Sequence, residues 1–454
     1  MKGGKETVYS MALSATSKVV TYFILLILAN LFLKEVYGRA AFVMSIFTLV
    51  LFFSLVGVPY ALVPWIVKKK DIRSVFNFLM ILSFVCVIVG LIATWQHRWI
   101  MPLVFLFPFL LVRGFSGAYL YSKYKQHLVV LGDLIYAISS FILIYSLRYL
   151  SKGGIILGYA GATIITSLIL ILWTRRDLAP LFKKFKINFY IVKHYVNNAI
   201  VTSLIYISFA FLDLLDSTII GILSTFENVA MYNVAGPISN VISLIPVTFG
   251  LFLLTKSSEM TDREYSRTIL FRMMRMSFSF SFLSAIGIVS LSYWIISIFF
   301  PKYVGVEPFI AILISGVVFY SLYNMICSYL LGKVMPKKAL FAIGFAAILN
   351  IVLDILLVSR FGLWGVCIAT LVAHAVAFTI LARRMRLLKS FWKVYLLILF
   401  IPLALYMQVY GLLLVVILIP LLLFCKLLKM EDIYFVRVII KDILKIRPRI
   451  KPLK

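Results

Sequence analysis

Uncharged apolar runs of about twenty residues recur along the whole chain, and they restrict its fold more than any other feature. A helix needs about 20 apolar residues to cross about 30 Å of hydrocarbon. Of the 454 residues, 63% are hydrophobic and 13% are charged, against about 25% charged residues in an ordinary soluble domain. We count about fourteen such runs. The sequence therefore predicts an all-α polytopic membrane protein and excludes a soluble globular enzyme.

The basic residues stand at the ends of these runs, in a pattern that orients the chain in the membrane. Lys and Arg number 45 against 16 Asp and Glu, a formal net charge of +29. With a cytoplasmic N-terminus, 36 of the 45 fall on the cytoplasmic side and 7 on the outer side. This asymmetry follows the positive-inside rule. We therefore expect a multi-pass protein of the cell membrane with both termini cytoplasmic, and no nucleic-acid partner.

The expected organisation is two six-helix lobes followed by two C-terminal helices. The uncharged run from Val394 to Cys425 would span about 48 Å as one helix, too long for one crossing, so we expect two helices that turn near Gly411. A basic connection divides the first twelve spans into six plus six. The predicted units are 1–174 (N-lobe), 175–194 (basic cytoplasmic linker), 195–383 (C-lobe), 384–428 (two further spans) and 429–454 (basic cytoplasmic tail).

A short internal match supports a repeat of the two lobes. Ser151–Ile155 (SKGGI) resembles Ser359–Leu363 (SRFGL). Each stretch falls at a tight outer turn, between spans five and six and between spans eleven and twelve. Glycine allows such a turn a positive φ and lets two helices approach closely. An even number of spans per lobe makes the repeats parallel, related by a pseudo-twofold axis along the membrane normal.

Three stretches resemble sequence patterns of the multidrug/oligosaccharidyl-lipid/polysaccharide (MOP) flippase superfamily. The first, which begins at Asn350, resembles the family pattern N-xxx-D…yG-xx-G…AT. The second, which begins at Lys34, resembles the first turn of the family, with Lys34 in place of the usual arginine. The third, which begins at Asp216, resembles the stretch that opens the second half of the family fold. Within the superfamily, the positions are most similar to the polysaccharide-exporter (Wzx-like) branch. The stretches are Asn350–Asp354 with Phe361–Gly365 and Ala369–Thr370, Lys34–Arg39 with Phe42, and Asp216–Gly221 with Val229–Tyr232 and Ala235.

The resemblance implies a V-shaped pair of lobes around a central cavity that faces the two sides of the membrane alternately. It implies a secondary transporter that moves a polyprenyl-linked oligosaccharide from the cytoplasmic to the outer leaflet. Such a protein is not an enzyme, holds no cofactor, and is coupled to Na⁺ or H⁺. The expected partners are the polyprenyl-linked oligosaccharide, anionic membrane lipids and polysaccharide-assembly membrane proteins, and we expect a monomer.

Two other functions remain as alternatives. The first is a cation-coupled multidrug (MATE-like) antiporter of the same fold. The second is a membrane-embedded glycosyltransferase or polymerase, which needs acid and base groups gathered in one site and usually a substantial outer domain. The predicted outer loops are short, at most about a dozen residues between Ser224 and Gly236, and they hold few carboxylates. The chain also lacks a GxxxxGK[ST] phosphate loop and a repeated selectivity-filter segment, which disfavours an ATPase and a channel.

Lys18 is the most distinctive charge within a predicted span. It lies about 15 Å into the first span, where a charged side chain costs at least about 2.5–3.5 kcal/mol. Ser14 and Thr21 share one face of the helix with it. We expect these three residues to bind the anionic phosphate end of the substrate. The alternative is a structural ion pair between Lys18 and a carboxylate across the bundle.

The other ionisable residues within spans are few, and the cysteines are isolated. Arg113 and Asp133 lie at similar depths on adjacent spans, which favours a structural ion pair, with substrate binding by Arg113 and ion coupling by Asp133 as alternatives. The isolated His374 is expected to be a hydrogen-bonded core residue. The four cysteines stand singly inside apolar runs, so we expect neither a disulfide nor a metal site.

Three carboxylates near the outer ends of spans are candidates for ion coupling. Asp213 and Asp216 share a face of span seven, and two carboxylates at that spacing could hold a proton or Na⁺. Both are expected near the outer end of the span, where a hydrated carboxylate is ordinary. Asp354 is expected near the outer surface as well. Together with Asn350, one helical turn earlier, it is assigned mainly to helix packing, with ion coupling as the alternative.

Overall fold

The structure is a computed structural model that describes residues 3–54, 62–67, 71–123, 125–182, 185–259, 262–333, 335–429 and 431. Within these ranges the side chains of some helical residues are not described, among them those of Ser14, Lys18 and Asp213. The described residues form helices joined by short turns, with no strand among them. This confirms the predicted all-α fold.

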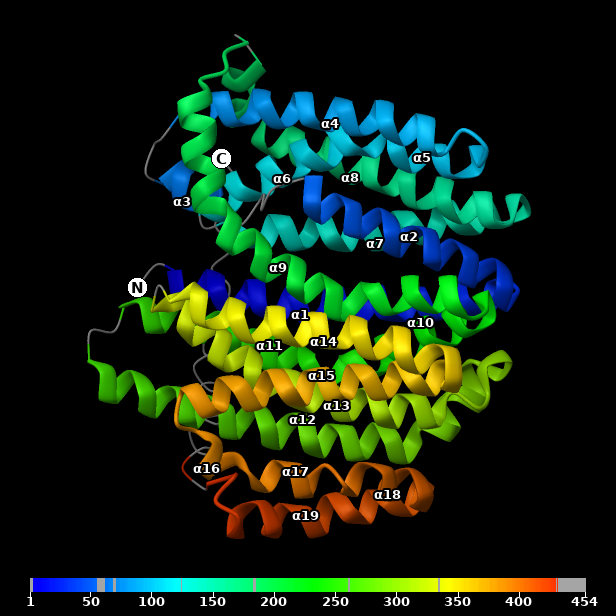
Figure 1. The fold of residues 1–454 in the computed structure, drawn as a ribbon, viewed down its shortest axis with the longest axis vertical. Coiled ribbons are helices and arrows are strands. Elements are labelled where there is room, and N and C mark those ends of the chain that lie inside the picture. Colours follow the sequence, from blue (N-terminus) through cyan, green and yellow to red (C-terminus); the bar gives the residue numbers. More distant parts are fainter. Residues whose placement is uncertain are drawn as a thin grey trace, which may run out of the picture.

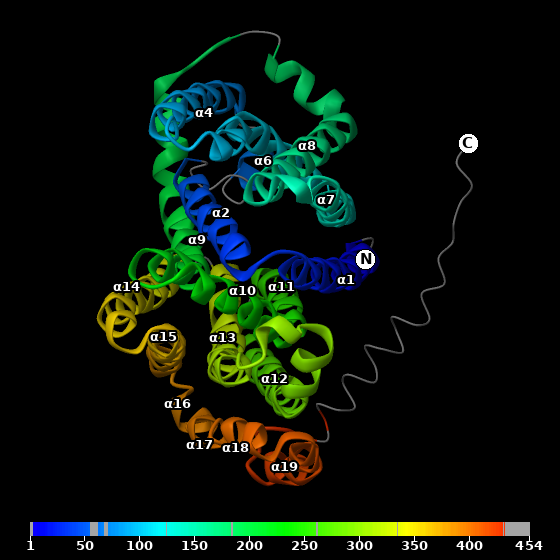
Figure 2. The ribbon, with the colours of Figure 1, turned by 90° about the vertical axis from the view of Figure 1, so that its right-hand side faces the viewer.

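The N-lobe, α1 to α8, occupies the upper half of Figure 1 apart from α1. Helix α1 packs along α7 and lies between the two lobes (Figure 2). The helices of this lobe are α1 (Gly3–Leu31), α2 (Lys34–Ser54), α3 (Leu62–Val67), α4 (Arg73–Ala93), α5 (Met101–Val104), α6 (Leu106–Ser122), α7 (Gln126–Ser146) and α8 (Lys152–Phe182).

The C-lobe, α9 to α15, occupies the lower half of Figure 1 apart from the first part of α9, which runs beside the N-lobe. Helix α9 crosses from the N-lobe to the C-lobe and packs against both α2 and α14. The helices are α9 (Phe189–Leu223), α10 (Phe226–Asn240), α11 (Leu244–Glu259), α12 (Arg263–Phe299), α13 (Glu307–Gly332), α14 (Pro336–Phe361) and α15 (Leu363–Arg384), with the 3₁₀ helix η4 (Pro301–Tyr303) between α12 and α13.

The C-terminal segment folds back on itself beside the C-lobe, at the bottom of Figure 1. As its length predicts, the long apolar run does not form a single helix. It turns at Gln408, whose φ is 50°, and α18 and η5 pack against α12. The elements are α16 (Leu388–Phe391), α17 (Lys393–Leu397), α18 (Phe400–Met407), η5 (Gln408–Gly411) and α19 (Leu412–Phe424).

Ten segments of the described residues are long and apolar enough to cross a membrane. They include the helices α4, α7, α8, α12, α13, α14 and α15, and the segment Leu388–Phe424 that contains the turn at Gln408. Apolar side chains on the outer surface of such helices, such as Ile92 and Phe424, are exposed. This arrangement suits a lipid environment and agrees with a multi-pass membrane protein.

Polar residues set the starts of three C-lobe helices. The side chain of Asn188 accepts hydrogen bonds from the backbone of the first turn of α9, Thr225 does the same for α10, and Asp262 does so for α12. Each cap satisfies backbone N–H groups that a helix leaves unpaired at its start, an effect typically worth about 1 kcal/mol.

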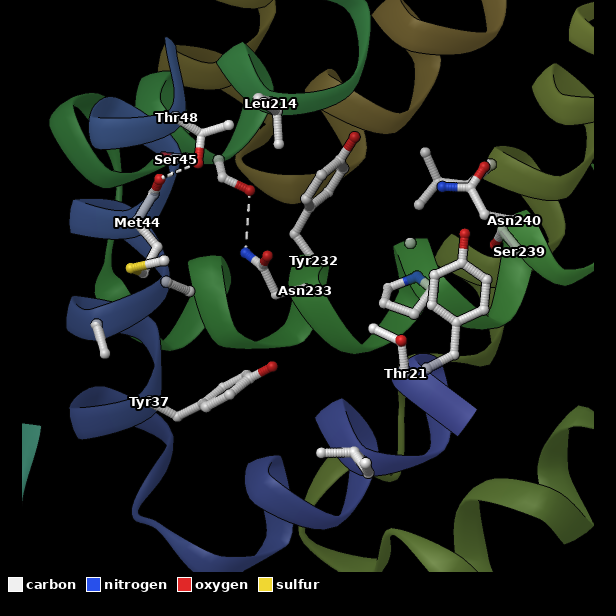
Figure 3. A pocket seen from close by; sticks show the side chains of 18 of the residues that line it. Thr21, Tyr37, Met44, Ser45, Thr48, Leu214, Tyr232, Asn233, Ser239 and Asn240 are labelled. Carbon is white, nitrogen blue, oxygen red and sulfur yellow. Dashed lines mark hydrogen bonds between the residues drawn. The ribbon is translucent and has the colours of Figure 1, made fainter. Parts of the chain in front are cut away.

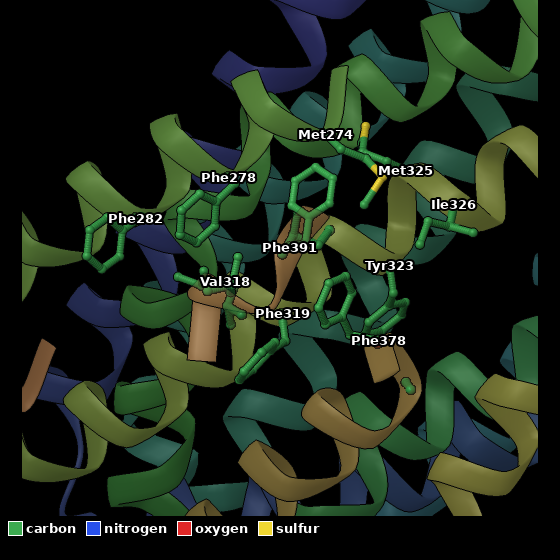
Figure 4. Packing of buried hydrophobic residues seen from close by; sticks show 14 of the residues in the cluster. Met274, Phe278, Phe282, Val318, Phe319, Tyr323, Met325, Ile326, Phe378 and Phe391 are labelled. Carbon is green, nitrogen blue, oxygen red and sulfur yellow. The ribbon is translucent and has the colours of Figure 1, made fainter. Parts of the chain in front are cut away.

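Among the described residues, four clusters of buried apolar side chains hold the molecule together, and two of them contain residues of both lobes. The largest cluster belongs to the C-lobe and the C-terminal helices, and Figure 4 shows its aromatic centre around Phe278, Phe319 and Phe378. One cluster lies within the N-lobe, and another packs N-lobe helices against Tyr195 and Ala199 of α9. The remaining cluster combines α1 and α2 residues, such as Leu28 and Ala40, with residues of α9, α10, α13 and α15. The two lobes are therefore packed together at the end where α1 meets α2, which we call the α1–α2 end.

The turn between α7 and α8 and the turn between α14 and α15 share one backbone geometry, in a different register from the sequence match. Ser151, after α7, has φ 54° and ψ −129°, and Gly362, after α14, has φ 54° and ψ −130°. Gly154 and Gly365 each donate a backbone hydrogen bond of 3.1 Å to these residues. The alignment of Ser151 with Ser359 is therefore wrong by three residues. Similar exposed side chains produced that match, whereas the positive φ defines the structural equivalence.

Candidate functional site

A cavity of about 400 Å³ lies between the two lobes, within the usual range for small-molecule sites. Helices α1, α2, α7 and α8 line it from the N-lobe, and α9, α10, α13 and α15 from the C-lobe. In Figure 3, Thr21 enters from α1, Tyr37 and Met44 from α2, and Tyr232 and Asn240 from α10. Because both lobes contribute, any movement of one lobe against the other changes the shape of this cavity.

The described lining of the cavity is uncharged and mixes hydroxyl and amide groups with apolar side chains. Hydroxyl and amide groups recur on both sides, and no Asp, Glu, Lys or Arg occurs among the lining residues that the structure describes. The polar lining residues are Thr21, Tyr22, Tyr37, Ser45, Thr48, Tyr136, Ser140, Tyr159, Ser217, Tyr232, Asn233, Ser239, Asn240, Thr370 and His374.

A buried carboxylate, Asp216 of α9, adjoins the C-lobe wall of the cavity. Its side chain is fully buried. Tyr232 and Thr370, which both line the cavity, donate hydrogen bonds to Asp216 Oδ2, and the bond from Thr370 is 2.7 Å long. A buried charge needs such donors to offset the loss of water. The wall of the cavity and the carboxylate therefore form one hydrogen-bonded network.

A second buried carboxylate, Asp354 of α14, lies within hydrogen-bond reach of Asp216. Asn350, one turn earlier, donates a hydrogen bond of 3.2 Å to Asp354 Oδ2. One side-chain oxygen each of Asp216, Asp354 and Asn350 is buried without a hydrogen-bond partner. Because two adjacent buried carboxylates repel each other when both are ionised, the arrangement fits a bound cation or a shared proton. Oxygen ligands of this type suit a hard cation.

Close backbone packing seals the α1–α2 end beyond the cavity. Gly38 of α2 lies so close to α10 that a Cβ atom there would be 1.8 Å from the Phe226 carbonyl oxygen. Gly221 of α9 is similarly close to the ring of Phe42. The rings of Phe42 and Phe226 pack edge to face at 5.6 Å. Gly38 therefore lets α2 approach α10, and Gly221 lets α9 approach α2, more closely than any larger residue would permit.

Hydrogen bonds tie the end of α1 to the C-lobe at the same place. Lys302 Nζ donates to the carbonyl of Asn30 at 2.6 Å, and the Tyr303 hydroxyl donates to the carbonyl of Ala29 at 3.0 Å. The Asn30 amide donates to the carbonyl of Phe299 at 2.5 Å. Burial raises the pKa of the Tyr303 hydroxyl, which keeps it protonated as a donor. Residues of η4 thus cap carbonyls at the C-terminus of α1, and Asn30 of α1 in return caps a carbonyl at the C-terminus of α12.

The residues proposed for phosphate binding are only partly described. Thr21 lines the cavity, and its hydroxyl donates to the Ser17 carbonyl at 2.8 Å. The side chains of Lys18 and Ser14 lie outside the described part of the chain, so their role stays a prediction. Lys18 belongs to α1, one turn before the cavity-lining Tyr22.

Arg113 and Asp133 form the ion pair expected from their depths. Arg113 Nη2 lies 2.8 Å from Asp133 Oδ1, and 51% of the Asp133 side chain is exposed. Arg113 also lies over the ring of Tyr136, which lines the cavity. Neither Arg113 nor Asp133 belongs to the described lining of the cavity. The structure therefore does not place Arg113 where it would contact a substrate in this cavity.

The carboxylates predicted for ion coupling are rearranged relative to the sequence prediction. Asp216 lies next to Asp354, which was not predicted as its neighbour. The side chain of Asp213, the predicted neighbour, is outside the described part of the structure. The expectation of a hydrated Asp216 is wrong, because its side chain is fully buried. Asp354, assigned mainly to helix packing, is fully buried as well. Helix ends predicted from hydropathy carry no information about the neighbouring helices that cover a residue. His374 is hydrogen-bonded to Tyr323 at 3.0 Å, as expected of a core residue, and it also lines the cavity.

Several residues of the site were not assigned a role from the sequence. Tyr37, Tyr159 and Asn240 line the cavity, and Tyr232 and Thr370 bind Asp216. Tyr232 and Thr370 belong to the stretches that resemble the superfamily. This resemblance is the sequence signal that could have marked them as site residues. Tyr159 and Asn240 lie outside the stretches that resemble the superfamily, so no comparable motif marks them.

Comparisons with known proteins identify relatives of the fold. No family model matches the chain. A curated relative, an uncharacterized membrane protein of Methanocaldococcus jannaschii, is 28% identical over 147 residues, which cover 31% of this chain and 29% of the relative. The match therefore spans less than a third of that protein.

Solved structures match nearly the whole chain. A structure of the lipid II flippase MurJ in an inward closed conformation is 18% identical, with a TM-score of 0.73 and coverage of 95% of this chain and 100% of MurJ. An inward-facing MATE multidrug resistance transporter of the MOP superfamily is 13% identical, with a TM-score of 0.64 and coverage of 86% of this chain and 98% of the transporter. A eukaryotic MATE transporter is 14% identical, with a TM-score of 0.59 and coverage of 85% and 96%. The chain has the fold of the MOP superfamily transporters.

Proposed function

We propose that this protein is a secondary-transport flippase that moves a polyprenyl-linked oligosaccharide from the cytoplasmic to the outer leaflet of the cell membrane. The observation that carries the proposal is a cavity between two lobes, lined by both apolar side chains and uncharged polar groups and sealed at the α1–α2 end by contacts that cross from lobe to lobe. In alternating access, these contacts separate when the opposite end closes. The likeness to MurJ and the Wzx-like motifs support a lipid-linked cargo.

The cargo is proposed to bind in two parts. The phosphate end contacts Lys18 together with Ser14 and Thr21, while the saccharide occupies the cavity between the lobes. A cation at Lys18 would neutralise the phosphate charge, whose transfer into an apolar medium is otherwise costly. Thr21 and Tyr22, three and four residues after Lys18, line the cavity and support this arrangement.

The driving cation is proposed to bind between Asp216 and Asp354. Their unpaired oxygens, with that of Asn350, offer a site for Na⁺ or for a shared proton. Thr370 and Tyr232 connect this site to the cavity wall, so occupancy can change the packing of α9, α10 and α15 around the cargo. We retain Asp213 as a prediction for the same function.

The test is transport by the purified protein in liposomes that contain a polyprenyl-diphosphate-linked glycan. The fraction of glycan accessible to an external glycosidase is expected to change with an imposed Na⁺ or proton gradient. Asp216→Asn is expected to abolish the dependence on the gradient, and Asp177→Asn, in an ion pair with Lys123, provides the control. Gradient-independent exposure equal to that of protein-free liposomes would refute the proposed function.

A cation-coupled multidrug antiporter is the second candidate. The buried carboxylate pair and the MATE-like fold favour it, because an antiporter needs a cation site that communicates with a central cavity. Release of an organic cation from loaded liposomes on addition of Na⁺ or acid, with no glycan transfer, would select this function. We propose no enzymatic activity, since the matched solved structures described above are those of transporters.

A further inference from the structure

Three polar groups face the cavity without a hydrogen-bond partner in the described structure. They are the hydroxyls of Tyr37 and Tyr159 and the side-chain amide of Asn240, and all three residues line the cavity. Tyr37 is 5% exposed and points into the cavity from α2, as Figure 3 shows. Tyr159 and Asn240 are half-buried, so these polar groups are open to the cavity, and a ligand that displaces water from them has to supply hydrogen-bond partners.

The three groups come from both lobes. Tyr37 belongs to α2 and Tyr159 to α8 of the N-lobe, whereas Asn240 ends α10 of the C-lobe. The Oδ1 atom of Asn233 adds a further acceptor, because only its Nδ2 atom is engaged, with Ser217 and the carbonyl of Val229. A ligand that satisfies these groups must carry several donors and acceptors spread around its perimeter.

The described part of the cavity wall carries no formal charge that would compensate a ligand charge. No ionisable acid or base other than His374 and the tyrosines occurs in the described lining, and the carboxylate oxygen Asp216 Oδ2 already accepts from Tyr232 and Thr370. An ionised group moved into such a cavity loses its hydration without gaining an opposite charge, at a cost of several kcal/mol. Neutral hydroxyl or amide groups lose less and find partners on both sides.

We propose that this cavity selects an uncharged saccharide, rich in hydroxyl or acetamido groups, as the cargo residue that it encloses. Tyr37, Tyr159 and Asn240 determine this specificity. The inference rests on the proposed function and narrows its substrate class, because it excludes glycans whose enclosed sugar is a uronic acid or carries a phosphate. The flat faces of the tyrosine rings also suit the apolar faces of a sugar ring.

The experiment compares two substrates that share one polyprenyl diphosphate carrier. One bears a neutral hexose disaccharide, and the other bears the same disaccharide with a uronic acid in place of the terminal hexose. Transfer of each by the purified protein in liposomes is followed by its accessibility to an external glycosidase. We expect the neutral substrate to be transferred at least about tenfold faster, as expected for one unpaired charge costing at least about 1.4 kcal/mol.

Variants connect the preference to the named residues. Tyr37→Phe, Tyr159→Phe and Asn240→Ala are each expected to slow transfer of the neutral substrate about fivefold, the loss expected for one hydrogen bond. Tyr149→Phe, at a 75% exposed position in the turn before α8, is the control. Asn240→Lys is expected to raise transfer of the uronic-acid substrate, because it supplies the missing opposite charge. This gain is a readout that a merely structural role of Asn240 would not produce.

Each outcome has a distinct meaning. Equal transfer of both substrates, or faster transfer of the uronic-acid substrate, overturns the inference and leaves the flippase function standing. Transfer of neither substrate overturns the proposed function itself, and the inference fails with it. A neutral preference that survives in all three single variants overturns the assignment of specificity to these residues.

Discussion

Thr370 of α15 donates a 2.7 Å hydrogen bond to the carboxylate of Asp216 in α9, a residue 154 positions earlier in the chain. Thr370 also lines the central cavity, while Asp216 lies beside the buried Asp354. This bond connects a site suited to a small cation with a site suited to a larger ligand. A cation that changes the orientation of Asp216 therefore acts directly on the wall that surrounds the cargo.

Thr370→Val should weaken the coupling of transport to the cation without preventing the substrate from binding in the cavity. The change removes a hydroxyl donor to a buried carboxylate, a hydrogen bond worth about 1.5–3 kcal/mol. We expect the Na⁺ or proton concentration for half-maximal transport to change at least about tenfold. The measurement is transport against cation concentration, with Thr379→Val, which bonds Tyr395 outside the cavity, as the control. An unchanged cation dependence would mean that Asp216 does not need this donor.

Lys18→Ala is expected to reduce glycolipid transport to near background while leaving membrane insertion unchanged. The loss follows from removing the proposed charge partner of the substrate phosphate. Lys18→Arg is expected to retain most of the activity, because it keeps the positive charge. Protein yield in the membrane fraction and transport in liposomes are measured side by side. Full activity of the alanine variant would exclude the phosphate-binding role.

Gly38→Ala should destabilise the sealed α1–α2 end. The new Cβ atom would lie 1.8 Å from the Phe226 carbonyl oxygen, so the two helices must separate, and overpacking of this kind typically costs about 1–3 kcal/mol. Spin labels at Glu35 and Glu227 are expected to report longer distances in the variant. Gly287→Ala, in α12, adds a Cβ atom with open space around it and is the matched control. Identical distance distributions in both variants would contradict the prediction.

Lys302→Met is expected to shift the equilibrium between the closed and the separated α1–α2 end by a smaller amount than Gly38→Ala. It removes the bonds from Nζ to the carbonyls of Asn30 and Phe32, but the site is exposed, so the loss is about 1 kcal/mol and the population shift about fivefold. The spin-label distances across the α1–α2 end provide the measurement. Arg360→Met, at another exposed outer turn, should leave them unchanged. A shift of equal size in both variants would indicate a general charge effect instead of this cap.

Ser151→Gly and Gln408→Gly should each raise the thermal stability of the purified protein. Both residues adopt the same positive-φ geometry as Gly362, with φ of 54° for Ser151 and 50° for Gln408. A non-glycine residue there costs about 1 kcal/mol or more, which glycine relieves in part. The measurement is the unfolding midpoint in detergent, and Gly362→Ala is expected to lower it. A decrease with Ser151→Gly would show that the turn carries no strain.

The sequence predicted some tertiary features because they depend on local chemistry. The turn at Gln408 followed from the length of the apolar run, and the ion pair of Arg113 with Asp133 followed from the cost of leaving either charge alone in a span. The register of the lobe repeat could not be found in this way. It depends on the backbone angles of Ser151 and Gly362, which leave little trace in side-chain similarity.

The sequence by itself determined the class of the protein, since apolar runs of span length leave a chain few options other than crossing a membrane as helices. The motif residues Asp216, Asp354 and Thr370 were also visible in it, but as separate stretches. Only the tertiary structure decided that these three residues meet in one buried network, and that Tyr37 and Asn240 face a common cavity from opposite lobes. The physical reason is that hydropathy records the preference of each helix for lipid, whereas a site depends on which helix faces pack against one another.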